Sequence, residues 1–147
     1  MIRLSKHFTL TELTRSATAA RYGIKNVPDN ASIINLRELC QNILEPVRLH
    51  YNIPFSPSSG FRSAELNSRI GSSGSSQHLL GQAVDFEIPG VANRAVADWI
   101  KNNLIYDQLI LEFHQEHIPS SGWIHCSYTP DNRMQALIFD GKNYSAF

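Results

Sequence analysis

Apolar side chains recur at steps of three and four residues after Asp29, which predicts a long amphipathic helix with one buried face. The centre of this apolar stripe is formed by Leu36, Leu39, Ile43 and Val47. Pro46 should kink the helix or end its regular part, because proline lacks an N–H and its ring crowds the preceding turn. Asp29 or Asn30 is placed to cap the first turn.

Two shorter helices are predicted on either side of the long one. Thr9 and Glu12 have the spacing of a capping box, so a short helix should begin there and end before Gly23. Asn93 could cap a second helix that runs to about Leu104. Apolar residues recur on one side of this second helix, so we expect that side to be buried.

Strands dominate the second half of the chain. Alternating or apolar runs bounded by turn residues predict strands over 106–113, 123–128 and 134–140, with a turn at 140–143. Helices therefore come first and antiparallel strands later, which favours an α+β fold with helices packed on a small antiparallel sheet. A length of 147 residues with no internal repeat indicates a single domain, 1–147.

Composition and charge exclude several kinds of partner. Thirteen basic and thirteen acidic residues give zero net charge, so nothing favours nucleic acid or an acidic membrane surface. No run approaches the length of a membrane span, and the first residues lack the apolar core of a signal peptide, so we expect synthesis in the cytoplasm. Cys40 and Cys126 lie in apolar segments and are interpreted as buried thiols. We also expect the protein to be a monomer.

The first candidate for chemistry is the stretch from Ser76 to Asp85, which carries one imidazole and one carboxylate. Alternation places Asp85 on the polar face of a short strand, opposite Val84 and the other apolar residues. Gly81 offers a turn that could bring His78 back to the same space. Imidazole and carboxylate are both ordinary zinc ligands, although one His and one Asp near each other more often form only a surface hydrogen bond.

His125 completes a set of two imidazoles and one carboxylate. It lies in the middle of a predicted strand, on the same face as Trp123, while Cys126 points to the other face. Three protein ligands leave a fourth position open, as catalytic zinc sites require. A fourth protein ligand, with Cys126 or His114 as the candidates, would instead indicate a structural zinc domain.

A hydrolytic zinc site also needs a base and a group that stabilises negative charge. Glu112 follows a strongly apolar strand, where an unpaired carboxylate is costly unless it is used. Arg62 follows Gly60 and Phe61 at the mouth of a loop, where a guanidinium could bind a carboxylate or a carbonyl oxygen. Each is also compatible with an ordinary surface residue.

Four ordered segments resemble the zinc D-Ala-D-Ala carboxypeptidase/endopeptidase family, closest to its small phage and prophage members. The segments are 59–63 (SGFRS), 76–85 (SxHxxGxAxD), 107–110 (DQLI) and 123–127 (WxHxS). The resemblance implies a Hedgehog/DD-peptidase-like fold and zinc bound by His78, Asp85 and His125. It also implies that Arg62 stabilises the substrate carbonyl or terminal carboxylate, with Ser76 as a polar group beside the metal.

The chain departs from this family at one position. Many members carry the catalytic Glu or His three residues before the second zinc-binding His, where this chain has Gly122. Glu112 is therefore the first candidate for the base, ahead of His114, Glu116 and His117.

The implied function is zinc-dependent hydrolysis of peptidoglycan stem peptides at a D-Ala-D-Ala or L-Ala-D-Glu type bond. We expect action at the cell wall, in phage or prophage lysis, with Ser76, Arg62 and Trp123 contacting substrate. The alternative is an inactive zinc-containing module that binds the cell wall or belongs to a phage particle.

Overall fold

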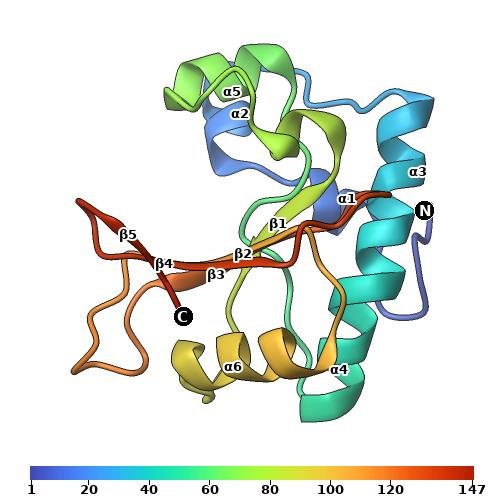
Figure 1. Cartoon of the computed structure of the whole chain (residues 1–147). Helices are drawn as coiled ribbons and strands as arrows, with labels where there is room; N and C mark the ends of the chain where they lie inside the picture. Colours follow the sequence, from blue (N-terminus) through green and yellow to red (C-terminus); the bar gives the residue numbers. More distant parts are fainter.

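The computed structural model describes residues 1–147 as helices around a five-stranded mixed sheet (Figure 1). The helices are α1 (Leu10–Thr14), α2 (Ala17–Tyr22), α3 (Asn30–Leu39), α4 (Glu45–Tyr51), α5 (Ala64–Ile70) and α6 (Asn93–Asn103), with the π-helical segment η1 (Cys40–Leu44) and the 3₁₀ helix η2 (Gln77–Leu80). The strands are β1 (Ala83–Phe86), β2 (Gln108–Glu112), β3 (Trp123–Ser127), β4 (Gln135–Phe139) and β5 (Tyr144–Ala146). The predicted α+β class is confirmed.

The long helix is present and is irregular near Pro46. Asp29 caps α3 by accepting a hydrogen bond from the backbone N–H of Ser32 at 2.8 Å. The helix then widens into η1, and Pro46 lies in the first turn of α4. A proline removes one hydrogen bond from the ladder and crowds the preceding turn, and a π-helical turn at that place accommodates both effects. The prediction of a disturbance at Pro46 is confirmed.

The N-terminal helical region is divided, where the sequence pattern predicted one helix. The capping box of Thr9 and Glu12 forms, but α1 ends at Arg15, whose backbone is extended. Ser16 then caps α2 by accepting from the backbone N–H of Ala19 at 3.1 Å, and Gly23 ends that helix in a left-handed conformation. The extended backbone at Arg15 and the new cap at Ser16 make this region two helices.

The strand order is β1-β3-β2-β4-β5, and one of the pairings is parallel. β1 with β3, β3 with β2, and β4 with β5 are antiparallel, whereas β2 and β4 are parallel, so the expectation of a wholly antiparallel sheet was wrong. The reason is that β3 already covers one edge of β2. The chain leaving β3 crosses to the free edge of β2 at the end where that strand begins, and it then runs in the same direction.

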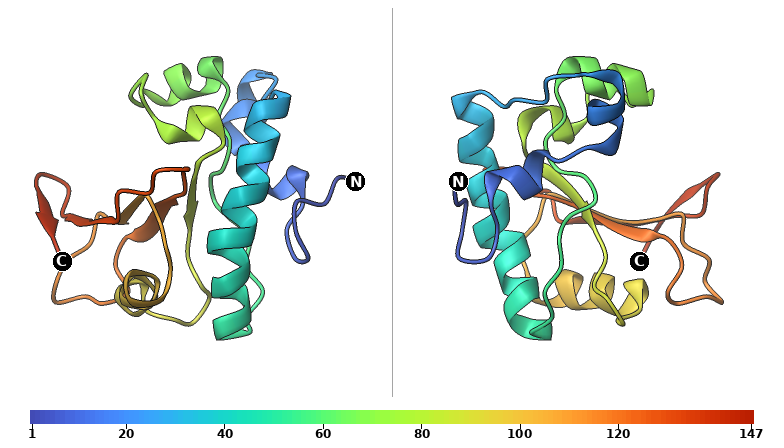
Figure 2. Two further views of the ribbon diagram at one scale, coloured as in Figure 1. Left: turned by 45° about the vertical axis from the view of Figure 1, so that its right-hand side comes forward. Right: turned by 180° about the vertical axis from the view of Figure 1, so that it is seen from behind.

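The core lies between the sheet and two helical layers. Helix α6 packs on β2 and β3, and α3 to α4 run beside β1, as the two views of Figure 2 show. One face of the sheet therefore contributes Val84, Leu109, Leu111, Ile124 and Cys126 to the buried core. The opposite face is turned towards η2 and α5 (Figure 1). Asp85 and His125 lie on this face. None of the helices combines the length and apolar composition needed to cross a bilayer.

Candidate active site

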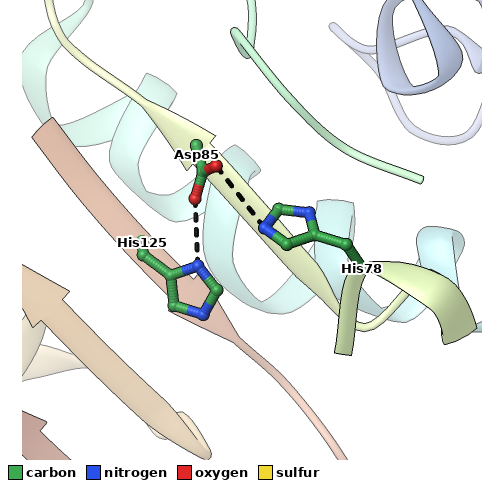
Figure 3. Close-up of side chains that lie close together, drawn as sticks. All are labelled: His78, Asp85 and His125. Carbon is green, nitrogen blue, oxygen red and sulfur yellow. Dashed lines mark hydrogen bonds and ion pairs between the residues drawn. The ribbon is translucent and has the colours of Figure 1, made fainter. Parts of the chain in front are cut away.

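The pairing of β1 with β3 places Asp85 directly opposite His125 on the polar face of the sheet. The Nδ1 atom of His125 lies 2.9 Å from Oδ1 of Asp85, and Nε2 of His78 lies 3.4 Å from Oδ2 of the same carboxylate. Figure 3 shows the two rings converging on Asp85 from different elements, His125 from β3 and His78 from η2. Residues that are far apart in the sequence thus meet at one point.

Local backbone geometry explains how His78 reaches this point. Ser76 caps η2 by accepting from the backbone N–H of His78, and Gly81 ends it with φ at 71°. A Cβ at residue 81 would lie 2.6 Å from the carbonyl oxygen of Ser32, so this close left-handed turn requires glycine. The turn therefore joins η2 to β1 in the geometry that lets His78 face Asp85.

The main chain also fixes the orientation of the His78 ring. Its Nδ1 donates a hydrogen bond of 2.7 Å to the carbonyl oxygen of Gly60, within a buried environment. With Nδ1 protonated, the neutral ring keeps its lone pair on Nε2, the atom that faces Asp85. Metal-binding histidines are commonly oriented by this kind of second hydrogen bond. Gly60 was not singled out from the sequence, because its contribution is a carbonyl oxygen.

These three side chains fit a divalent metal ion. One ligand atom from each of His78, Asp85 and His125 lies within 4.8 Å of the others. Burial alone would raise the pKa of Asp85, but the hydrogen bond from His125 and the adjacent His78 ring outweigh it and hold that pKa well below its usual range. The carboxylate is therefore ionised, as a metal ligand must be.

No sulfur atom belongs to this group of donors. Cys126 is fully buried in the core on the opposite face of β3, as strand alternation predicted, and burial raises the pKa of its thiol. His114 is also outside the group; its Nδ1 lies 3.1 Å from the hydroxyl of Ser121. The donor set is thus two imidazoles and one carboxylate, the composition of a site with an open position.

Arg62 lies on the border of this group. Its Nη2 is 3.5 Å from Oδ2 of Asp85, while Nε donates to the hydroxyl of Ser59 at 3.2 Å and Nη1 to that of Ser72 at 3.4 Å. Its side chain is only 13% exposed, so the guanidinium is held in place rather than moving freely in solvent. This leaves a fixed positive charge beside the carboxylate.

Glu112 faces the same space from β2. It pairs with Trp123 across the β2–β3 ladder, two pairs beyond the pair of Ile110 and His125, so the side chains of Glu112 and His125 share one face. Burial raises the pKa of the Glu112 carboxyl, and the nearby His125 partly opposes this effect. Glu112, Arg62, Ser76 and Trp123 all line a cavity of about 650 Å³ that also contains the three converging donors.

The other candidates for the base lie elsewhere. Glu116 is exposed and forms an ion pair of 3.4 Å with Arg94, and His117 is exposed. Neither they nor His114 line the cavity. Two lining residues, Phe139 and Tyr144, were missed because no motif marks them and because their hairpin reaches the sheet through the pairing of β4 with β2, which are distant in the sequence.

The comparison with known families agrees with this geometry. No curated protein sequence matches the chain. A family model described as Peptidase M15 matches residues 6–127, which include His78, Asp85, Glu112 and His125. Because that match extends over most of the 147 residues, the chain belongs to the peptidase M15 family, the D-Ala-D-Ala carboxypeptidase family.

Proposed function

We propose that this protein is a zinc-dependent peptidase that cuts the stem peptides of peptidoglycan, at a D-Ala-D-Ala or L-Ala-D-Glu type bond. The observation that carries the proposal is one cavity holding three converging metal donors, a raised-pKa carboxylate and a fixed guanidinium. Membership of the peptidase family indicates the class of reaction. The residues that line the cavity include the chemical groups that such a reaction needs. We further propose that the protein acts at the cell wall, in phage or prophage lysis.

Zinc is the metal that best suits the donors. Two neutral imidazoles and one carboxylate form a common catalytic zinc set. When bound, zinc supplies a Lewis acid that acidifies water and polarises a carbonyl group. His78 and Asp85 contribute to this by their fixed orientation, since one is tied to the main chain and the other is kept ionised.

Glu112 is the proposed general base. Its carboxylate would take a proton from the attacking water and return it to the leaving amine nitrogen. A raised pKa suits both halves of this task, because a base is most useful when its pKa approaches the working pH. A carboxylate next to the donors favours turnover over a module that only binds the wall.

Arg62 is the proposed electrostatic partner of the substrate. Its hydrogen bonds to Ser59 and Ser72 hold the guanidinium at the cavity wall, where it would bind the scissile carbonyl oxygen or a terminal carboxylate. Ser76 and Trp123 line the same cavity and are proposed to contact the peptide on either side of the scissile bond.

Digestion of purified peptidoglycan tests the proposal. The protein is incubated with the polymer alone, with a chelator, and with a chelator followed by zinc, and the released fragments are identified by mass spectrometry. We expect new amino and carboxyl termini within the stem peptide, their loss with chelator and their return with zinc. Absence of any peptide cleavage by the zinc-loaded protein, or cleavage that chelator leaves unchanged, would overturn it.

A further inference from the structure

The C-terminal strands extend the wall of the candidate active site. Residues 128–147 lie beyond the part of the chain that the Peptidase M15 model matches. Nevertheless Phe139 of β4 and Tyr144 of β5 line the cavity that holds His78, Asp85 and His125. A segment outside the matched region therefore shapes the space available to the substrate.

An unbroken row of aromatic rings leads from β3 to β5. Trp123 stacks with Phe113 at a centroid distance of 5.2 Å, Phe113 meets Phe139 edge to face at 5.1 Å, and Phe139 stacks with Tyr144 at 4.6 Å. Phe113 has φ at 51°, a left-handed conformation that is costly for a bulky side chain. The row ends at Tyr144, which remains 58% exposed.

Tyr144 stands where the first cavity meets a second one. The neighbouring cavity has a volume of about 430 Å³ and shares Tyr144, His125, Ser72 and Ser76 with the first. The space open to a substrate therefore continues past His125 and past the aromatic row. A ligand longer than a short peptide could occupy both parts at once.

The second cavity is lined mainly by hydrogen-bonding groups. Ile110 and Tyr144 are its apolar residues, and hydroxyl, amide and guanidinium groups make up most of the remainder, among them Ser75, Gln108 and Arg133. A purely aliphatic or aromatic ligand group would displace water from these polar groups without replacing the hydrogen bonds of that water, which is unfavourable. A ligand with one apolar face and many polar substituents satisfies both kinds of surface.

We propose that this second cavity is a saccharide subsite in which a pyranose ring lies on the face of Tyr144. The C–H groups on one side of the sugar ring would pack on the aromatic face, whose negative quadrupole favours such contact. The hydroxyl and acetamido groups would exchange hydrogen bonds with Ser75, Gln108 and Arg133. The proposal rests on the proposed function, because the stem peptides of peptidoglycan are attached to a glycan strand.

Two matched substrates test the subsite. One is a free stem peptide, and the other is the same peptide linked to its N-acetylglucosamine–N-acetylmuramic acid disaccharide. We expect kcat/KM to be about tenfold higher for the linked substrate, equivalent to about 1.4 kcal/mol. Tyr144→Ala should bring this ratio close to one, whereas Tyr144→Phe, which keeps the ring, should preserve it. Ser145→Ala, on the other side of β5, should also preserve it.

A titration with the disaccharide alone separates this proposal from the proposed function. Chemical shifts of the Tyr144 ring are followed by NMR as the disaccharide is added to the wild-type protein, with maltose as the control sugar. Saturable shifts that are specific to the disaccharide support the subsite even if neither substrate is cut. Absence of such shifts, or an equal loss of activity on both substrates in Tyr144→Ala, would overturn it.

Discussion

Gly122 packs directly against the main chain of Glu112, so that a Cβ atom at residue 122 would overlap the Glu112 carbonyl oxygen. The φ angle of Gly122 is also positive, at 73°. As noted in the sequence analysis, many members of the D-Ala-D-Ala carboxypeptidase family carry the catalytic Glu or His at this position. Here no side chain fits, and the nearest carboxylate on the cavity side is Glu112 on the adjacent strand. This packing is the reason that the proposed base is Glu112 on β2 and not residue 122.

Substitution of Gly122 should therefore destabilise the protein. Gly122→Ala combines an unfavourable left-handed backbone with a steric overlap, and we expect a loss of about 1–3 kcal/mol in the free energy of unfolding. Urea unfolding followed by circular dichroism measures it. Gly23→Ala isolates the backbone contribution, because Gly23 has φ at 64° but no atom within 4 Å of the place that a Cβ would take. An equal cost at both positions would show that the overlap at Gly122 relaxes without penalty.

Glu112→Gln should separate metal binding from turnover. The amide keeps the size of the side chain but cannot accept a proton, so kcat should fall by about 10²–10⁴-fold, the usual contribution of a general base. Zinc affinity, measured by competition with a chromophoric chelator, should stay within a few-fold of wild type. Glu116→Gln, an exposed position outside the cavity, is the matched control and should retain activity. Near wild-type turnover in Glu112→Gln would remove Glu112 from this role.

Zinc should stabilise the folded protein through the His78, Asp85 and His125 group. A ligand present at a hundred times its Kd adds about 2.7 kcal/mol if it binds only the native state. We expect zinc to raise the Tm of the wild-type protein and to leave that of His125→Ala nearly unchanged. His117→Ala, at an exposed histidine outside the cavity, should respond like wild type. A zinc-dependent rise that survives in His125→Ala would place the metal elsewhere.

The polar face of the sheet could be predicted from the sequence because it depends on local periodicity. Alternation along β1 and β3 put Asp85 and His125 on one side and Cys126 on the other, and the strand pairing keeps that separation. The direction of a strand, in contrast, could not be predicted from local periodicity. Whether β4 pairs with β2 or with another strand depends on which edge is already occupied, and no residue near Gln135 carries that information.

The hydrogen-bond partners of a side chain were also difficult to predict where the residue type suits two different roles. Asn93 was expected to cap α6, yet Ala92 occupies the cap position. The Asn93 amide instead donates to the carbonyl oxygens of Ser120 at 3.1 Å and Gly122 at 2.8 Å, which ties α6 to the turn before β3. Asparagine suits both roles chemically. The choice depends on a turn 27 residues further along the chain, which a local pattern does not show.

Asp107 provides a stability prediction that depends on pH. This nearly buried carboxylate accepts hydrogen bonds from the backbone N–H of Arg133 at 2.9 Å, from its Nε at 3.0 Å and from its Nη2 at 2.7 Å. It also accepts one from the Gln77 side chain at 2.8 Å. Hydrogen bonds from the Arg133 side chain are the main reason that the pKa of Asp107 falls to about 2. The contacts hold the crossing segment between β3 and β4 against the start of β2.

The sign of the pH effect follows from the lowered pKa. In the unfolded chain the carboxyl of an aspartate has a pKa of about 3.9, so the stabilisation is complete above that pH and is lost as the pH falls towards 2. Asp107→Asn should cost about 1–3 kcal/mol at pH 6, because it removes charge-assisted hydrogen bonds from a buried group. The difference between wild type and variant, measured by urea unfolding, should shrink between pH 4 and pH 2. Asp131→Asn, at an exposed residue of the same segment, should show no such convergence. A difference that stays constant over this range would mean that the Asp107 charge does not stabilise the crossing segment.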